Sequence, residues 1–153
     1  MARVSTCLNF PRSTEEAFLF YRSVFGGSFN GHVARFCDMP PDSRPAGQPA
    51  MAEADRQLVM HVELPILGGH VLMGSDAPES MGFDVTSGSQ VNINLEPDTR
   101  EEADRLFQGL SSGGVVEMPM QDMFWGAYFG RFRDRYGVRW MVNCANPPAG
   151  GTP

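Results

Sequence analysis

The feature of the sequence that most constrains its fold is an internal repeat. Two segments, 13–27 and 99–114, share the same order of a capping residue, Glu-Glu-Ala, a periodic apolar stripe and Gly-Gly. Apolar side chains that recur every three to four residues predict an α-helix with one buried face. A glycine after each stripe supplies the left-handed residue that often ends a helix. The chain is therefore predicted to contain the same structural unit twice.

The two predicted helices start in the same way and bury the same kind of face. Ser13 or Thr14 can accept hydrogen bonds from free amides in the first turn of the first helix. Asp98 or Thr99 can do so in the second, and the glutamates that follow place negative charge at the positive end of each helix dipole. The predicted buried stripes are Ala17, Phe18, Tyr21 and Phe25 in the first helix and Ala103, Leu106, Phe107 and Leu110 in the second.

Each predicted helix follows one strand-like run and precedes three more. The runs are Ser5–Phe10, Ser28–Phe36, Leu58–Leu67 and His70–Asp76 around the first helix, and Gln90–Leu95, Val115–Met120, Tyr128–Arg133 and Val138–Cys144 around the second. This order predicts an α+β fold of two βαβββ modules, about 3–77 and 88–146, in a single domain of residues 1–153. We assign no role to the loop at 39–56 and expect the tail at 147–153 to be flexible.

Composition excludes several classes of partner. The net charge of −6 and the pI of about 4.9 argue against nucleic acid, whose phosphates need a basic surface. No uninterrupted apolar run is long enough to cross a bilayer, and no apolar block near the first residue resembles a secretory signal. Three cysteines without a CxxC pair indicate reduced thiols. We therefore expect a cytoplasmic protein that binds neither nucleic acid nor membrane.

Several motifs follow one another from Ser5 to Cys144. They are LNF…EEAF.FYRSVFGG, HVEL…LMGSD, EEADRLFQGLSSGG, FWGAYFG and D.YGVRWMVNC. In this order the chain resembles the vicinal oxygen chelate superfamily, which includes glyoxalases, bleomycin- and fosfomycin-resistance proteins and extradiol dioxygenases. It is most similar to the bacterial PhnB-like branch, often labelled 3-demethylubiquinone-9 3-methyltransferase. The resemblance implies two modules that form a curled, open, barrel-like mixed sheet with helices outside, commonly in a homodimer.

The resemblance also indicates where a metal would be bound. The metal enzymes of the superfamily carry ligands on the first and last strands of each module, pointing into the cleft. Carried over to this chain, these positions are Thr6, Met73, Gln90 or Asn92, and Met141. Neutral amides and thioethers are poor ligands for the common divalent metals. The resemblance therefore implies a cleft without a metal, and we expect no cofactor.

Amides and aromatic side chains are the candidates for a binding surface. In the run 90–95 the amides alternate with Val91, Ile93 and Leu95, which are expected beneath the helices. The amides either face solvent on an ordinary strand or line a cleft for a neutral, polar organic ligand. The aromatic run Met123–Phe132 is either core packing or a wall of that cleft. The predicted ligand-binding residues are Thr6, Met73, Gln90, Asn92, Asn94, Gln121, Trp125, Phe129, Met141 and Asn143.

The leading functional prediction is a PhnB-like protein that binds a small organic molecule in a metal-free cleft, for example to sequester a toxic compound. The alternative is a metal-dependent lyase, isomerase, dioxygenase or thiol transferase that uses His61 and Glu63, which share one face of a predicted strand. The residues identify no catalytic group. A methyltransferase activity has no support in the sequence, because no glycine-rich turn opens a helix as in Rossmann-type cofactor sites.

Overall fold

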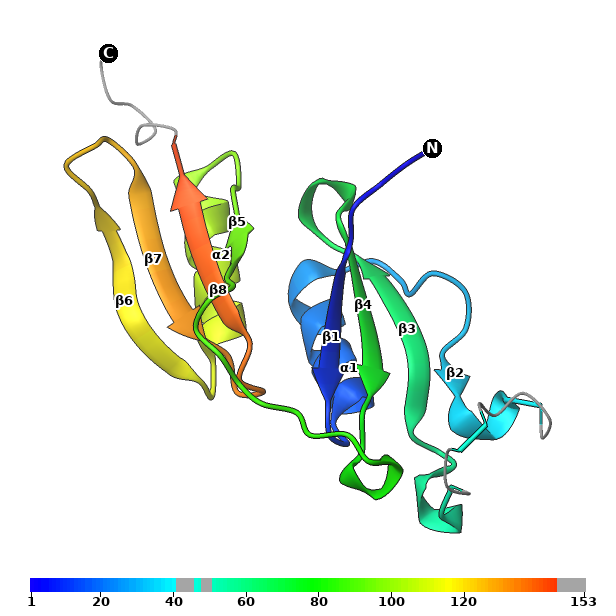
Figure 1. Cartoon of the computed structure of the whole chain (residues 1–153). Helices are drawn as coiled ribbons and strands as arrows, with labels where there is room; N and C mark the ends of the chain where they lie inside the picture. The colour runs from blue at the N-terminus through cyan, green and yellow to red at the C-terminus, as the bar shows by residue number, and fades with distance from the viewer. Residues whose placement is uncertain (41–45, 48–50, 146–153) are drawn as a thin grey trace. The chain divides into compact units, whose positions relative to one another are not determined.

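Figure 1 shows the computed structural model of the chain, in which residues 1–40, 46–47 and 51–145 are described. The chain divides into two compact units, Met1–Thr86 (unit 1) and Ser87–Pro153 (unit 2). The predicted tail at 147–153 and part of the predicted loop at 39–56 lie outside the described residues. Among the described residues, no helix combines the length and the apolar character needed to cross a membrane.

Unit 1 is a mixed sheet with an α-helix on one face. Its strand order is β1-β4-β3-β2, in which β1 runs parallel to β4 and the other neighbours are antiparallel. The elements are β1 (Thr6–Phe10), α1 (Thr14–Phe25), β2 (Ala34–Arg35), β3 (Val59–Pro65) and β4 (Val71–Asp76). Short 3-10 helices occupy Phe36–Asp38, Glu53–Asp55, Leu67–Gly69 and Glu79–Met81.

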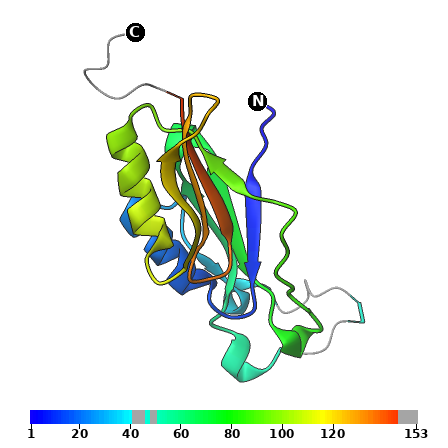
Figure 2. The ribbon, with the colours of Figure 1, turned by 90° about the vertical axis from the view of Figure 1, so that its left-hand side faces the viewer.

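Unit 2 repeats the same plan. Its strand order is β5-β8-β7-β6, again with one parallel pair, β5 and β8. The elements are β5 (Ile93–Leu95), α2 (Arg100–Ser111), β6 (Val115–Asp122), β7 (Tyr128–Arg133) and β8 (Arg139–Cys144). The predicted α+β class and the two βαβββ modules are confirmed. In Figures 1 and 2 each helix lies against one face of its own sheet, and the described residues of that unit place no helix on the opposite face.

Aromatic side chains of the two helices pack directly on glycines of the sheets. A Cβ atom at Gly74 would lie 2.3 Å from Cε2 of Phe18, and one at Gly130 would lie 2.8 Å from Cε2 of Phe107. No other residue type leaves room for rings at this distance. The predicted helix faces are confirmed, except that Phe25 is only partly buried. The buried residues of the two predicted stripes are Ala17, Phe18, Tyr21, Ala103, Leu106, Phe107 and Leu110.

The two helices are capped by different means. Thr99 accepts a hydrogen bond from the amide of Glu102 at 3.2 Å, as its position predicts. Ser13 makes no such bond at the start of α1. Instead, Asp76 at the end of β4 accepts from the amide of Thr14 at 3.1 Å and from the amide of Val59 at 2.8 Å. One buried carboxylate thus joins the beginnings of α1 and β3 to the end of β4.

A second buried carboxylate organises the turn between β7 and β8. Oδ1 of Asp134 accepts from the amides of Tyr136 at 2.8 Å and Val138 at 3.0 Å. Its Oδ2 accepts from the indole N–H of Trp140 at 2.9 Å, and Gly137 has the positive φ of 91° that the turn requires. The motif Asp-Arg-Tyr-Gly-Val-Arg-Trp therefore serves to close this hairpin and to hold Trp140 in the core.

Two strands differ from the prediction. The run Ser28–Phe36 forms a strand only at Ala34–Arg35, where a register shift interrupts its pairing with β3. β5 begins at Ile93, so Gln90 and Asn92 precede the strand. Val91 was expected beneath a helix but is 75% exposed. Alternation predicts facing only where backbone pairing holds the chain extended, and these segments lack that pairing.

We predict that Asp134→Ala strongly destabilises the protein. The substitution leaves three N–H donors without their acceptor in a residue that is only 3% exposed. Each orphaned donor costs about 1–3 kcal/mol, so the free energy of unfolding should fall by roughly 3 kcal/mol or more in urea denaturation. Asp84→Ala, at an exposed position, should change it by less than about 0.5 kcal/mol. A loss at Asp134 no larger than this control would contradict the assigned role.

An ionic cluster ties the segment before β3 to the end of β1. Nη1 of Arg12 lies 2.5 Å from Oδ1 of Asp55, and the hydroxyl of Ser80 also donates to that carboxylate. Arg12 reaches Glu79 as well, at 3.1 Å. The bonds from Arg12 first, and then from Ser80, hold the pKa of Asp55 below its ordinary value. The carboxylate form of Asp55 therefore stabilises the folded state.

This depressed pKa predicts a pH-dependent effect of Asp55→Asn. The stabilisation by the carboxylate is fully present above the unfolded-state pKa, about 3.9, and is lost as the pH falls through the lower folded-state pKa. The variant should therefore have a lower Tm than the parent at pH 7, and the difference should shrink below about pH 4. Thermal unfolding at a series of pH values measures this. A Tm difference that is the same at all pH values would exclude a role for the charge.

Candidate functional site

The face of the unit 2 sheet opposite α2 gathers five of the ten predicted binding residues. Register pairs Asn94 with Met141 and Asn143 with Phe129, and Gln121 pairs with Phe129 on the other side. Paired residues point to the same side of a sheet. On β8, Met141 and Asn143 alternate with Trp140 and Val142, which are buried on the α2 side of the sheet. We call the side with Asn94, Gln121, Phe129, Met141 and Asn143 the open face of unit 2.

Asn143 is the most informative residue on this open face. Its Oδ1 atom is buried, yet it has no hydrogen-bond partner among the described residues. A buried acceptor without a donor costs about 1–3 kcal/mol. Native structures keep such groups rarely, and chiefly where an unseen partner satisfies them. The position therefore calls for an N–H or O–H group that the described chain does not supply.

Aromatic rings border the open face at the turn between β6 and β7. The Trp125 ring lies 6.4 Å from the Phe129 ring and 5.0 Å from the Phe124 ring, both edge to face. Gly126, with a φ of 97°, and the bond from the amide of Met123 to Ala127 O at 2.8 Å form the turn. Trp125 is 56% exposed and Phe124 is 97% exposed. These rings are therefore available to a ligand rather than buried in the core.

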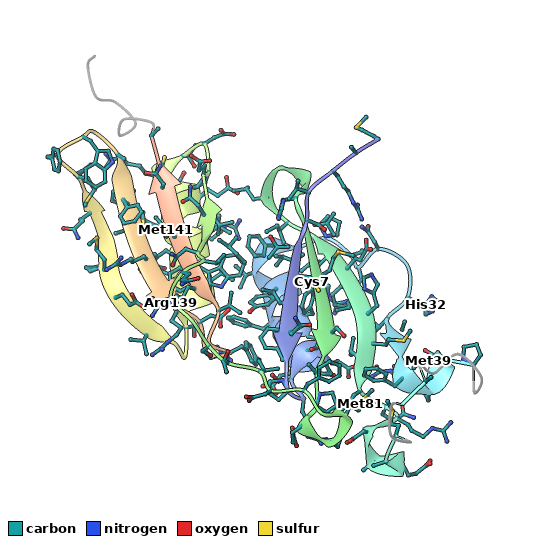
Figure 3. The ribbon with its side chains drawn as sticks, viewed as in Figure 1. Cys7, His32, Met39, Met81, Arg139 and Met141 are labelled. Atoms are coloured by element: carbon teal, nitrogen blue, oxygen red, sulfur yellow. The ribbon has the colours of Figure 1, made fainter. Side chains whose placement is uncertain are left out.

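Charged side chains on the same face were missed by the sequence reasoning, which expected only neutral groups. Arg131 pairs with Met141, and Arg139 lies two residues before Met141 on β8 (Figure 3). Glu117 joins them, 2.7 Å from Nη1 of Arg139 and 3.8 Å from Nε of Arg131. The alternation of β7 and β8 could have revealed both arginines, because they have the same parity as Phe129 and Met141.

The remaining predicted residues do not all share one face. Gln90 and Asn92 are exposed before β5 and have no assigned strand face. Met73 lies on the side of the unit 1 sheet opposite α1, where its register partner is Cys7, labelled on β1 in Figure 3. Thr6 pairs with Leu72, which is fully buried on the α1 side. The prediction that Thr6 points the same way as Met73 is therefore wrong. Thr6 lies on the α1 side of the sheet, and Met73 lies on the opposite side.

The open face of unit 1, which carries Cys7, Glu63 and Met73, has a different chemistry. Nε2 of His61 lies 3.0 Å from Oε1 of Glu63, and the hydroxyl of Ser5 donates to the Met73 sulfur at 3.1 Å. Hydrogen bonds from His61 first, and then from Asn30, hold the pKa of Glu63 below its ordinary value. Partial burial raises the pKa of the Cys7 thiol. This face thus holds an ionised glutamate and a protonated thiol.

No metal centre can be assembled from the described part of either unit. Those residues contain no group of three or more His, Cys, Asp or Glu side chains placed to hold an ion. His61 and Glu63 supply two candidate ligands, one short of the usual minimum of three protein ligands for zinc. The expectation of a metal-free, cofactor-free site remains a prediction.

Comparison with known proteins identifies the family. A family model described as 3-demethylubiquinone-9 3-methyltransferase matches residues 2–143. The crystal structure of protein PA1353 from Pseudomonas aeruginosa is 34% identical, with a TM-score of 0.77 over 94% of this chain and 98% of that one. A PhnB protein from Bacillus cereus, titled a putative 3-demethylubiquinone-9 3-methyltransferase, is 26% identical with a TM-score of 0.71 over 94% and 100% of the two chains. The chain belongs to this PhnB-like family.

Two further known proteins are similar to this PhnB-like chain. Protein YjdN of Escherichia coli K12 is 26% identical over 142 residues, which are 92% of this chain and 93% of that one. A glyoxalase/bleomycin resistance protein/dioxygenase family enzyme from Burkholderia phytofirmans is 17% identical, with a TM-score of 0.59 over 92% and 98% of the two chains. The second likeness shows the fold alone. The predicted resemblance to the vicinal oxygen chelate superfamily and its PhnB-like branch is confirmed.

A network on the α2 side of the sheet holds β7, and hence Phe129, in place. The Tyr128 hydroxyl donates to Oδ1 of Asp104 on α2 at 2.6 Å. The Arg100 guanidinium lies 4.5 Å above the Tyr128 ring and also bonds Asp122 of β6. The bond to Asp104 first, and then burial, raises the pKa of Tyr128 to about 12. Tyr128 therefore stays protonated and keeps donating at any physiological pH.

We predict that Asp104→Asn lowers the pKa of Tyr128 toward the ordinary tyrosine value of about 10. The amide oxygen can still accept the bond, but the negative charge that opposes ionisation is gone. In an ultraviolet absorbance titration, the step that is absent in Tyr128→Phe identifies Tyr128, and this step should move to lower pH in Asp104→Asn. Asp84→Asn provides the matched control, because Asp84 is exposed, and should leave the titration unchanged. A Tyr128 step that stays at its original pH in Asp104→Asn would contradict the assignment.

Proposed function

We propose that this PhnB-like protein binds a small organic molecule on the open face of unit 2. A flat ring of the ligand packs against Trp125 and Phe129, and an N–H or O–H group of the ligand donates to Asn143. Gln121 and Asn94 supply further hydrogen bonds, while Met141 provides an adaptable apolar contact. The observation that carries this proposal is the buried, unpartnered Oδ1 atom of Asn143 beside an aromatic wall.

Energetics favour a ligand over a purely structural role for Asn143. A leucine at this position would cost the fold nothing in unsatisfied hydrogen bonding, whereas asparagine carries the penalty of a buried free acceptor. A bound donor turns that penalty into affinity, because the acceptor is already desolvated and oriented. The exposed Trp125 offers the large, stiff contact area that flat ligands use.

Binding alone is sufficient for the activity that we favour. Sequestration of a harmful compound requires shape and hydrogen bonds but no reacting group, and the open face of unit 2 offers such contacts. We further expect a cytoplasmic homodimer, whose oligomeric state light scattering would measure. The name of the matching family includes a methyltransferase activity, which we do not propose. Each described helix connects the two edge strands of a four-stranded sheet, β1 to β2 and β5 to β6, and no glycine-rich turn opens it as in a cofactor-binding Rossmann unit.

A metal-dependent reaction is the second candidate. His61 and Glu63 lie 3.0 Å apart on the open face of unit 1, a spacing that two metal ligands or a proton-transfer pair can use. Metal analysis of the purified protein, with thermal shifts against divalent ions, separates this candidate from the first. Stoichiometric metal that is lost in His61→Ala would favour the enzyme over the binding protein.

Asn143→Leu should separate ligand binding from stability. The two probes are phenylnaphthylamine, which has one N–H donor, and phenyl naphthyl ether, which lacks it. The parent protein should prefer the amine by about fivefold, the worth of one neutral hydrogen bond. In Asn143→Leu the preference should disappear, while the Tm stays equal or rises because the buried free acceptor is gone. Fluorescence titration of the amine and competition by the ether measure both affinities.

Two controls make this result specific. Asn9→Leu, at an exposed asparagine of β1, should leave the preference for the amine unchanged. Phe129→Ala should weaken both probes together, because it removes the wall and not the acceptor. Saturable binding of neither probe by the parent protein would overturn the proposed function, as would a preference for the amine that survives in Asn143→Leu.

A further inference from the structure

The open face of unit 2 carries more arginines than acids. Arg131 and Arg139 both contact Glu117, so one carboxylate serves two guanidinium groups. Arg133 pairs with Arg139 in register and therefore lies on the same face. Among the described residues Arg133 has no acidic partner within ion-pair distance. The local charge is positive, although the whole chain has a net charge of −6.

The arginines lie at a defined distance from the aromatic wall. Arg131 is two residues from Phe129 along β7, on the same side of the sheet. Two residues of a strand span roughly 6.6 Å. This is about the distance between the centre of a ring and an acidic group attached to it or to the next ring. The neutral acceptor Asn143 lies beside Phe129. The ring, the hydrogen-bond donor and the acidic group of a single ligand could therefore each contact a residue of this face.

We propose that the ligand of this face is an aryl organic anion: a flat ring system with a carboxylate, sulfonate or phosphate group and an N–H or O–H donor. This inference rests on the proposed function and specifies its ligand. The ring contacts Trp125 and Phe129, the donor reaches Asn143, and the acid is held by Arg131 and Arg139. Guanidinium groups suit this task, because their parallel N–H groups match two oxygens of one acid.

Glu117 is consistent with this assignment. Its carboxylate holds Arg139 at 2.7 Å and Arg131 more loosely at 3.8 Å, which keeps the side chains gathered before a ligand arrives. Arg139 is further held by its Nε, which donates to Gly88 O at 3.2 Å. Arg131 is 50% exposed in its side chain and can turn toward an incoming acid. The single carboxylate neutralises only part of the positive charge, so the face attracts anions.

The test compares two probes that differ in one acidic group. Anilinonaphthalene sulfonate has the ring system and the N–H of phenylnaphthylamine, with a sulfonate added. The parent protein should bind the sulfonate at least about tenfold more tightly than the neutral amine at low salt, and added salt should reduce that advantage. Arg131→Gln and Arg139→Gln should each lower the affinity for the sulfonate by about three- to tenfold. The affinity for the amine should change by less than about twofold.

Arg105→Gln is the matched control. It removes the same charge from α2 in the same unit, where Arg105 is 55% exposed, and should change neither affinity by more than about twofold. Arg131→Gln keeps the test decisive if Arg139→Gln unfolds, because Arg131 is the more exposed of the two. Equal affinity for both probes would contradict the proposal that the ligand is an anion, as would a sulfonate affinity that falls as much in Arg105→Gln as in Arg131→Gln. Either result would leave the proposed binding surface intact. If neither probe binds saturably, the proposed function itself fails, and this inference fails with it.

Discussion

Each unit of this protein depends on a buried carboxylate that accepts hydrogen bonds from more than one part of the chain. Asp76 receives amides from α1 and from β3, and Asp134 receives two amides of its turn and the indole of Trp140. Both are only 3% exposed. A buried charge is tolerated only where several donors surround it. These two residues therefore hold the helix and strands in the positions that define each open face.

The two units have the same topology but carry different chemistry on their open faces. Unit 1 presents the hydrogen-bonded side chains of His61 and Glu63 together with the sulfur atoms of Cys7 and Met73. Unit 2 presents amides, aromatic rings and arginines. In both units a glycine of the sheet lets a helical phenylalanine approach closely on the opposite side. The side that holds the helix is thus alike in the two repeats, whereas the opposite side carries different residues in each.

Strand alternation predicts much of the candidate site, and the residues for which this prediction fails have a physical explanation. Asn143, Met141 and Asn94 fall on one face as expected, because β5 and β8 are continuously paired. Gln90 and Asn92 lie in a segment without backbone pairing, so alternation has no meaning there. Thr6 was assigned from the family resemblance, but its register partner is Leu72, which places Thr6 on the α1 side of the sheet. Arg131 and Arg139 were not predicted, although their parity with Phe129 and Met141 places them on the same face.

The sequence by itself determined the repeat, the two helices with their buried stripes and the class of the fold. These follow from local periodicity and from glycines placed after each helix, which act over a few neighbouring residues. Only the tertiary structure decided that Asp76 caps α1 from 62 residues away, that Asn143 keeps a buried acceptor free, and that Glu117 gathers Arg131 and Arg139. Such relations depend on the pairing register between strands, and a shift of one residue would move every one of these side chains to the other face.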